Sequence, residues 1–125
     1  RQYCAYVQRY SVKDYTPLVQ KVINHINLNL AEPMSLKSLA AMCFISPSYL
    51  SSLFKQDTGT TIVDYINTQR VDRAAVLLAT TDRSIAAVAA AVGILDVNYF
   101  TKIFKKQLGT TPTQYRREKK ATLNG

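Results

Sequence analysis

The chain of 125 residues is long enough for one compact domain or two small subdomains, and its apolar fraction of 47% excludes a disordered chain. Its formal net charge of +8 suits a nucleic acid or an anionic membrane surface as partner. No apolar run approaches the ~20 residues of a membrane span, and one histidine with two distant cysteines does not make a zinc site. We therefore expect no metal, no cofactor and no place in a membrane.

The first clear helix is predicted after Thr16, because threonine is a good N-cap and Pro17 fits the first helical turn. Pro33 ends it. Its apolar residues recur every four positions: Leu18, Val22, Ile26 and Leu30. Residues 1–15 carry only a weak helical stripe, and the chain starts at Arg1 rather than Met. We interpret them as a linker or the tail of an upstream domain.

A short helix, a tight turn and a second helix are predicted next. Ser35 caps the short helix, residues 44–45 form the turn, and Ser46 opens the second helix, which Gly59 stops. One face of this second helix is apolar: Leu50, Leu53 and Phe54. The other face is polar: Ser48, Ser51, Ser52 and Lys55.

A long helix from Thr61 to about Ala79 is predicted to join two similar units. Its ~18 residues span about 27 Å, so it can hold the units rigidly apart. The second unit starts with a short helix capped by Ser84, and its turn at 93–95 carries one extra residue before Asp96 caps the following helix. That helix is apolar at Phe100, Ile103 and Phe104 and polar at Asn98, Thr101, Lys102 and Lys105. Residues 111–114 read as a capping box that opens a last helix.

The two units are copies of one sequence. Residues 49–65 and 99–115 are identical at seven of seventeen positions. The identical pairs are Tyr49/Tyr99, Phe54/Phe104, Lys55/Lys105, Gly59/Gly109, Thr60/Thr110, Thr61/Thr111 and Tyr65/Tyr115. Tyr65, Tyr99 and Tyr115 are therefore expected to pack inside the units. An all-α fold of two repeated helix-turn-helix units follows.

Positive charge gathers in the second copy. Seven of the sixteen cations lie between residues 102 and 120, against one acid, Glu118. They are Lys102, Lys105, Lys106, Arg116, Arg117, Lys119 and Lys120. The first copy is nearly neutral, with Lys37 and Lys55 against Asp57.

Helix-turn-helix units use the second helix to offer small, hydrogen-bonding or cationic side chains to a major groove. The polar faces described above have this character, so DNA binding is the first interpretation. A helical protein-interaction module with an incidental basic face is the alternative. An enzyme is not expected, because the sequence has no catalytic His, Cys or carboxylate set and no phosphate-binding glycine loop.

Two segments carry a family resemblance: SLKSLAAMCFISPSYLSSLFKQDTGTTIVDYINTQRVDRAAVLL and SIAAVAAAVGILDVNYFTKIFKKQLGTTPTQYR. They resemble the DNA-binding domain of AraC/XylS-type bacterial transcription regulators over roughly residues 17–118. The resemblance implies seven helices, two helix-turn-helix units on a long linker helix, and binding to DNA as a monomer. It implies base-reading positions at Ser48, Ser51 and Ser52 and at Val97, Asn98, Thr101 and Lys102. An arginine is common in the family where Ser52 stands, so the strongest guanine reader is missing from the first helix.

The predicted DNA contacts fall into three groups. The first recognition helix contributes Ser46, Ser48, Ser51, Ser52 and Lys55. The second contributes Val97, Asn98, Thr101, Lys102, Lys105 and Lys106. Further phosphate contacts are expected from Lys37, Arg116 and Arg117. We expect the second unit to supply most of the electrostatic affinity and the first to supply register and shape readout.

The expected organisation is a linker or upstream tail (1–15), a first helix-turn-helix subdomain (16–60), a linker helix (61–80), a second subdomain (81–120) and a frayed tail (121–125). The expected partner is operator or promoter DNA in the bacterial cytoplasm, where the protein would be nucleoid-associated. RNA polymerase is a second expected partner if the protein is an activator. The resemblance also implies an upstream sensor or dimerisation domain that this chain lacks.

Overall fold

The computed structural model describes residues 15–124, and this part of the chain is all-α, as predicted. The seven helices are α1 (Pro17–Leu28), α2 (Leu36–Met42), α3 (Pro47–Thr58), α4 (Ile62–Thr80), α5 (Ile85–Ala91), α6 (Val97–Leu108) and α7 (Pro112–Asn124). The interpretation of residues 1–15 as a linker or upstream tail falls almost wholly outside the described residues.

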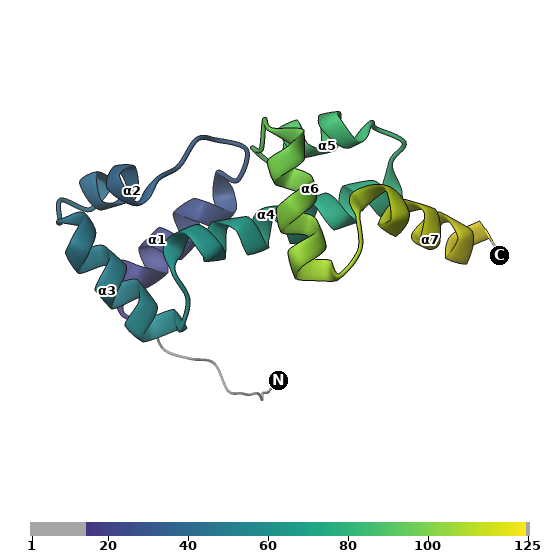
Figure 1. Ribbon diagram of the computed structural model, residues 1–125. Helices are drawn as coiled ribbons and strands as arrows, with labels where there is room; N and C mark the ends of the chain where they lie inside the picture. Colours follow the sequence, from purple (N-terminus) through teal and green to yellow (C-terminus); the bar gives the residue numbers. More distant parts are fainter. Residues whose placement is uncertain (1–14, 125) are drawn as a thin grey trace.

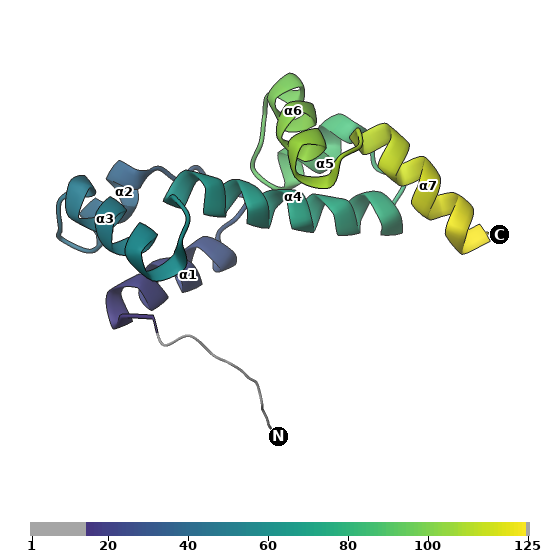
Figure 2. The same cartoon turned by 60° about the horizontal axis from the view of Figure 1, so that its bottom comes forward.

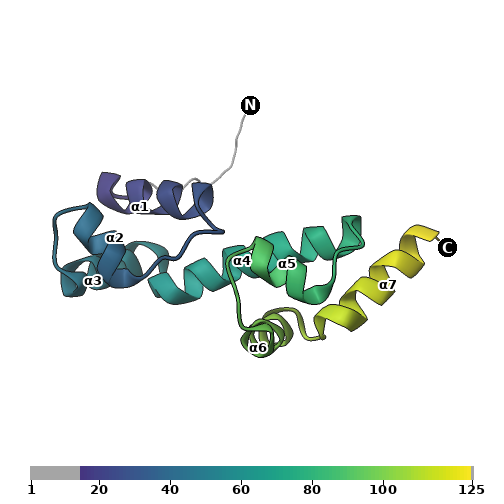
Figure 3. The ribbon, with the colours of Figure 1, turned by 90° about the horizontal axis from the view of Figure 1, so that it is seen from above.

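The helices form two units strung along α4. Helices α1, α2 and α3 cluster at the beginning of α4, whereas α5, α6 and α7 pack along its middle and second half (Figure 1). Figure 2 shows α4 as one straight helix that passes from the first unit into the second. Seen from above, α6 stands end-on to one side of α4, and α7 leads away toward the C-terminus (Figure 3). The long linker helix predicted from the sequence is thus confirmed.

Side-chain caps begin the helices where the sequence places them. The hydroxyl or carboxylate oxygen of each N-cap accepts a backbone N–H three residues on, which satisfies one of the unpaired donors of the first turn. The caps are Thr16, Ser35, Ser46, Thr61, Ser84 and Asp96. The predicted capping box at α7 is half formed: Thr111 Oγ1 accepts the Gln114 N–H at 3.2 Å, but the Gln114 side-chain oxygen accepts from Arg117 Nη1 at 3.1 Å instead of from the N-cap N–H.

Two helix ends differ from the prediction. Helix α1 ends at Leu28 rather than near Pro33, because the Asn29 side-chain amide donates to the His25 carbonyl at 2.8 Å and takes up an end group of the helix. Leu30, counted on the helical stripe, lies beyond the helix and is buried there. At the other end of the chain, α7 remains helical through Asn124, within the tail expected to fray.

Two apolar cores hold the fold together, and they share no buried residue. Helix α4 supplies Ile62 and Ile66 to the first core and Val71, Ala74, Ala75 and Leu78 to the second. Phe54 fills the first core and Phe104 the second, each fully buried. Each phenylalanine meets the tyrosine that follows it in the repeat, edge to face: Phe54 and Tyr65 with ring centroids 5.6 Å apart, Phe104 and Tyr115 5.5 Å apart.

The third repeated tyrosine does not pack in a core. Tyr99 is 42% exposed, and its hydroxyl accepts a hydrogen bond of 2.8 Å from the Asn67 side-chain amide on α4. The expectation of a packing role therefore holds for Tyr65 and Tyr115 but is wrong for Tyr99. Its repeat partner Tyr49 is also exposed.

Both helix-turn-helix turns use a left-handed residue. In the first turn Phe44 has φ of 60°, and in the second Gly93 has φ of 90°. After each, a backbone N–H reaches back to the short helix: Ile45 N to Ala40 O at 3.1 Å and Ile94 N to Ala89 O at 2.8 Å. This is the hydrogen bond that closes a Schellman-type helix end.

Phe44 is in a conformation that favours glycine, yet its side chain is 94% exposed and gains little by packing. Phe44→Gly should therefore raise the free energy of unfolding by about 1 kcal/mol, because glycine removes the steric cost of the left-handed region. Phe44→Ala should give little of this gain, since alanine keeps the Cβ. Urea denaturation of both variants checks this. Equal stability of the two variants would show that the gain does not come from the backbone.

Candidate nucleic-acid interface

The polar face of α3 is open to solvent. Ser48, Ser51, Ser52 and Lys55 are all exposed. Ser46, at the start of the helix, has a structural task as well: its Oγ accepts the Tyr49 N–H at 3.1 Å. The Ser46 hydroxyl can still donate its own hydrogen to an acceptor. The surface is therefore made of short hydroxyl side chains with one cation at the C-terminal end.

Asp57 does not belong to this exposed face. It is half-buried, and its carboxylate accepts the backbone N–H of Thr16 at 2.8 Å, which ties α3 to the start of α1. The sequence had weighed Asp57 against Lys37 and Lys55 and predicted near-neutrality around α3. This contact leaves the charge count around α3 unchanged, so near-neutrality stays a prediction, while the two lysines are exposed and the acid is not.

The α6 surface combines exposed and half-buried residues. Asn98, Lys102, Lys105 and Lys106 are exposed, and Val97 and Thr101 are half-buried. The apolar side of the helix is anchored by Phe100 and Phe104, both fully buried. Cationic side chains therefore follow α6 from its second turn to its end.

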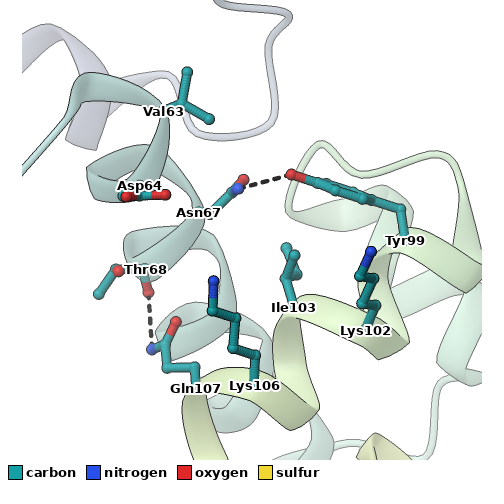
Figure 4. A pocket seen from close by; sticks show the side chains of 9 residues that line it. All are labelled: Val63, Asp64, Asn67, Thr68, Tyr99, Lys102, Ile103, Lys106 and Gln107. Atoms are coloured by element: carbon teal, nitrogen blue, oxygen red, sulfur yellow. Dashed lines mark hydrogen bonds between the residues drawn. The ribbon is translucent and has the colours of Figure 1, made fainter.

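Polar contacts fix α6 on α4. Besides the bond between Asn67 and Tyr99, the Gln107 amide donates to the Asp72 carboxylate at 2.8 Å and approaches the Thr68 carbonyl at 3.4 Å. These contacts border a hollow of about 470 Å³ between the two helices, into which Lys102 and Lys106 also extend (Figure 4). The hollow is lined by Val63, Asp64, Asn67, Thr68, Tyr99, Lys102, Ile103, Lys106 and Gln107.

The basic cluster of the sequence divides into cations with different surroundings. Lys120 pairs with Asp82, with Nζ 3.3 Å from the carboxylate, and Lys119 Nζ lies 5.4 Å from the centre of the Tyr115 ring. Both contacts are near the surface, where such pairs contribute little. Arg117 is exposed and donates to the Gln114 side chain at 3.1 Å.

Arg116 is occupied by the fold. Its Nε donates to the Leu78 carbonyl at 3.1 Å and its Nη2 to the Thr81 carbonyl at 3.2 Å, so the guanidinium satisfies the C-terminal end of α4. The side chain is half-buried. This geometry gives Arg116 a structural role, whereas the sequence had grouped it with the phosphate contacts.

Arg70 was not singled out by the sequence. It lies on α4, where its Nε donates to the Leu30 carbonyl at 3.0 Å and its Nη2 to the Glu32 carbonyl at 2.8 Å. Burial lowers the pKa of the Arg70 guanidinium, and the proximity of Tyr99 partly offsets this. Its acceptors are carbonyls some 40 residues away in a loop, and no spacing rule predicts such a pair. The one signal in the sequence is the position of this arginine on α4, between the residues that enter the first core and those that enter the second.

Within residues 15–124, no helix is both long and apolar enough to cross a membrane. Cys43 is an unpaired cysteine that packs half-buried against the first core.

Known proteins share this arrangement. A family model described as "Helix-turn-helix domain" matches residues 39–118. The C-terminal domain of AraT, a response regulator from Geobacillus stearothermophilus, is similar in structure with a TM-score of 0.81 at 33% identity, covering 83% of this chain and 87% of that one. The DNA-binding domain of AdpA, a global transcriptional factor solved with a target DNA, also gives 0.81, at 29% identity over 86% of this chain and 96% of that one.

The chain belongs to the AraC-type helix-turn-helix DNA-binding domains. It is thus of the kind found in transcription regulators. Among curated proteins, this AraC-type domain is 38% identical over 109 residues to the bifunctional transcriptional activator/DNA repair enzyme AdaA of Bacillus subtilis. The match covers 86% of the chain but 52% of AdaA, and a match to the arabinose operon regulatory protein of Escherichia coli covers 34% of that protein. The domain therefore spans from about a third to half of the length of these relatives.

The neighbouring arginines of α7 should behave differently in this AraC-type domain. Arg116→Gln should lower the free energy of unfolding by about 1 to 2 kcal/mol, because two carbonyls lose a charged donor. Arg117→Gln, on the exposed side of the same helix, should change it by less than about 0.5 kcal/mol. Urea denaturation followed by circular dichroism measures both. If the two variants were equally stable, the end of α4 would not depend on Arg116.

Proposed function

We propose that this domain binds a specific double-stranded operator, with α3 and α6 in successive major grooves. The observation that supports this most directly is that each repeated unit presents the polar face of its second helix to solvent, while both units are held by α4. A major groove about 12 Å wide accepts such a helix. The relation to the AdpA domain, which was solved with a target DNA, is consistent with this proposal.

In this proposal α6 supplies most of the electrostatic attraction. Lys102, Lys105 and Lys106 are exposed along it, and each lysine that neutralises a phosphate releases a counterion and strengthens binding at low salt. Asn98 is the best base reader on this helix, because an amide can pair with adenine in two hydrogen bonds. Val97 and Thr101, half-buried, would approach bases through apolar contact and a single hydroxyl.

Helix α3 would contribute differently. Hydroxyl groups bond bases or phosphates without strong preference, so Ser48, Ser51 and Ser52 would set register more than sequence. Lys55 and, from α2, Lys37 would contact phosphates, as Arg117 would beside the second unit. The Asp57 carboxylate would take no direct part in these contacts, because it accepts the Thr16 N–H at the start of α1. Arg116 is left out of the interface because its guanidinium is bound to α4.

The geometry of α4 suits two neighbouring grooves. Its 19 residues span about 28 Å, comparable with the ~34 Å of one turn of DNA. A helix of this length can place α3 and α6 on one side of the duplex. Any remaining difference would be met by a bend in the DNA.

The rest of the regulator is part of the proposal. We place an upstream sensor or dimerisation domain before this chain and, for an activator, a contact with RNA polymerase. The complete protein would act on the nucleoid in the bacterial cytoplasm, and this domain would have no catalytic role. A protein-interaction module with an incidental basic face is the alternative that DNA-binding experiments must exclude.

The division between the units can be measured through salt. Lys102→Ala with Lys105→Ala should make the slope of log K against log salt concentration shallower by the equivalent of one to two phosphate contacts. Each contact contributes about 0.9 to the magnitude of this slope. Ser51→Ala with Ser52→Ala should leave that slope unchanged and alter base preference. Fluorescence anisotropy on one duplex, selected by this domain from a random library, measures both. A larger change of slope for the serine pair would refute the division.

The placement in two grooves predicts a distinct footprint. Hydroxyl-radical footprinting on the selected duplex should show two protected regions about 10 bp apart on one face, because successive major grooves repeat with the helical turn. A single protected region, or two on opposite faces, would exclude simultaneous insertion of α3 and α6. The absence of DNA binding at low salt would favour the protein-interaction alternative.

A further inference from the structure

The two recognition helices have no common apolar core to fix their relative position. On α4 the first core ends with Ile66 and the second begins with Val71. The positions in between carry polar side chains, and these reach across the boundary in both directions. The angle between the units therefore depends on the rigidity of α4 and on these polar contacts.

Arg70 reaches from α4 to the loop that follows α1. Its Nε and Nη2 bind the carbonyls of Leu30 and Glu32, at 3.0 Å and 2.8 Å. A guanidinium is a rigid planar fork, so two bonds from one side chain fix the direction of the loop as well as its distance. Leu30 itself is buried in the first core, which makes the loop a rigid part of the first unit.

The turn of the second unit presses against the same loop. A Cβ on Gly93 would lie 2.5 Å from the Leu30 carbonyl oxygen and 3.1 Å from Cζ of Arg70. Gly59 and Gly109 also have positive φ, but a Cβ on either would meet nothing within 4 Å. Gly93 is therefore needed for close approach as well as for its backbone conformation. The Leu30 carbonyl sits between an arginine of α4 and the turn before α6.

The opposite connection is made by Asn67. It lies on α4 next to Ile66 of the first core, and its side-chain amide donates a hydrogen bond of 2.8 Å to the Tyr99 hydroxyl of α6. Contacts from α4 thus reach the first unit through Arg70 and the second recognition helix through Asn67. Both lie within the short stretch of α4 that separates the cores.

We propose that Arg70, packed against Gly93, is a positioning residue that sets the separation of α3 and α6 and so the half-site spacing that the domain accepts. We call the contacts of Arg70 with the loop after α1 and with Gly93 the clamp. Its consequence for half-site spacing rests on the proposed function, whereas its effect on the relative position of the two units does not. When two linked modules bind two sites, affinity depends on how well the linkage matches their separation. A rigid clamp favours one spacing, and a loosened clamp accepts several with lower affinity for the best.

Two variants of Arg70 and one of Gly93 test the proposal, and each position has a matched control. Arg70→Gln removes the charge and the fork, and Arg70→Lys keeps a cation and the aliphatic stem but cannot bind two carbonyls in plane. Arg73→Gln is the control, since Arg73 is exposed on the same helix. Gly93→Ala is compared with Gly59→Ala, which carries similar backbone strain without the clash. If Arg70→Gln does not fold, Arg70→Lys and the glycine pair still carry the test.

The clamp is measured first without DNA. Spin labels at Gln56→Cys on α3 and Ala90→Cys on α5, both exposed positions, report the distance between the units by pulsed electron resonance. Cys4→Ser and Cys43→Ala remove the native thiols from the background. We expect a narrow distance distribution for the parent and the controls, and a broadened or displaced one for the Arg70 variants and Gly93→Ala.

Spacing preference is measured second, on the selected duplex and on versions with one or two base pairs inserted or removed between the half-sites. The parent and Arg73→Gln should prefer one spacing by about tenfold, and the Arg70 variants should flatten this preference to about threefold or less. Affinity for a duplex with one half-site should stay unchanged, which loss of fold would not allow.

The outcomes separate the two proposals. Distance distributions as narrow as the parent's and centred at the same distance, in the folded Arg70 variants and in Gly93→Ala, would overturn the clamp. An undiminished spacing preference would overturn the proposed effect of the clamp on half-site spacing. A domain that binds no DNA would overturn the proposed function. The distance measurement would then still decide whether Arg70 positions the units.

Discussion

Helix α4 is buried in two cores at once, and the rest of the structure depends on this. Its first turns bring Ile62 and Ile66 to the core around Phe54, and its last turns bring Val71 to Leu78 to the core around Phe104. Each unit alone buries few residues, so each relies on a stretch of α4 to close it. A single helix that completes both cores makes the two units inseparable, although they share no buried side chain.

The double role of α4 extends the repeat beyond the two similar segments, residues 49–65 and 99–115. Val71 and Ala75 stand 49 residues after Val22 and Ile26, the same offset that relates the short helices, and all four side chains are buried. The second half of α4 is thus to the second unit what α1 is to the first. The contacts of two arginines fit the same correspondence between α1 and the second half of α4. Arg70 binds carbonyls just after α1 and Arg116 binds carbonyls at the end of α4, so in each unit the last helix closes the end of the first.

Local signals made the helices predictable. Cap residues, glycine stops and apolar periodicity act over a few positions, so helix order, the linker helix and most N-caps followed from the sequence. The polar faces of α3 and α6 followed from the same periodicity. Contacts between distant residues did not: Asp57 turns to α1, Tyr99 to α4 and Arg116 to the end of α4, although each looked like a surface or core residue of its own helix. Charge counted along the chain cannot tell which charged groups make contacts within the fold, and Asp57 and Arg116 are two such groups.

The turns show where the two copies had to differ. Phe44 and Gly93 occupy the same left-handed position, 49 residues apart. In the first unit this position faces solvent, so a phenylalanine is tolerated at the cost of backbone strain. In the second unit the Leu30 carbonyl and the Arg70 guanidinium occupy the space that a Cβ would need. The neighbouring unit thus adds a steric requirement for glycine to the left-handed backbone that both turns share. The repeat is constrained most tightly where its copies meet, and that junction lies between the helices that we propose read the DNA.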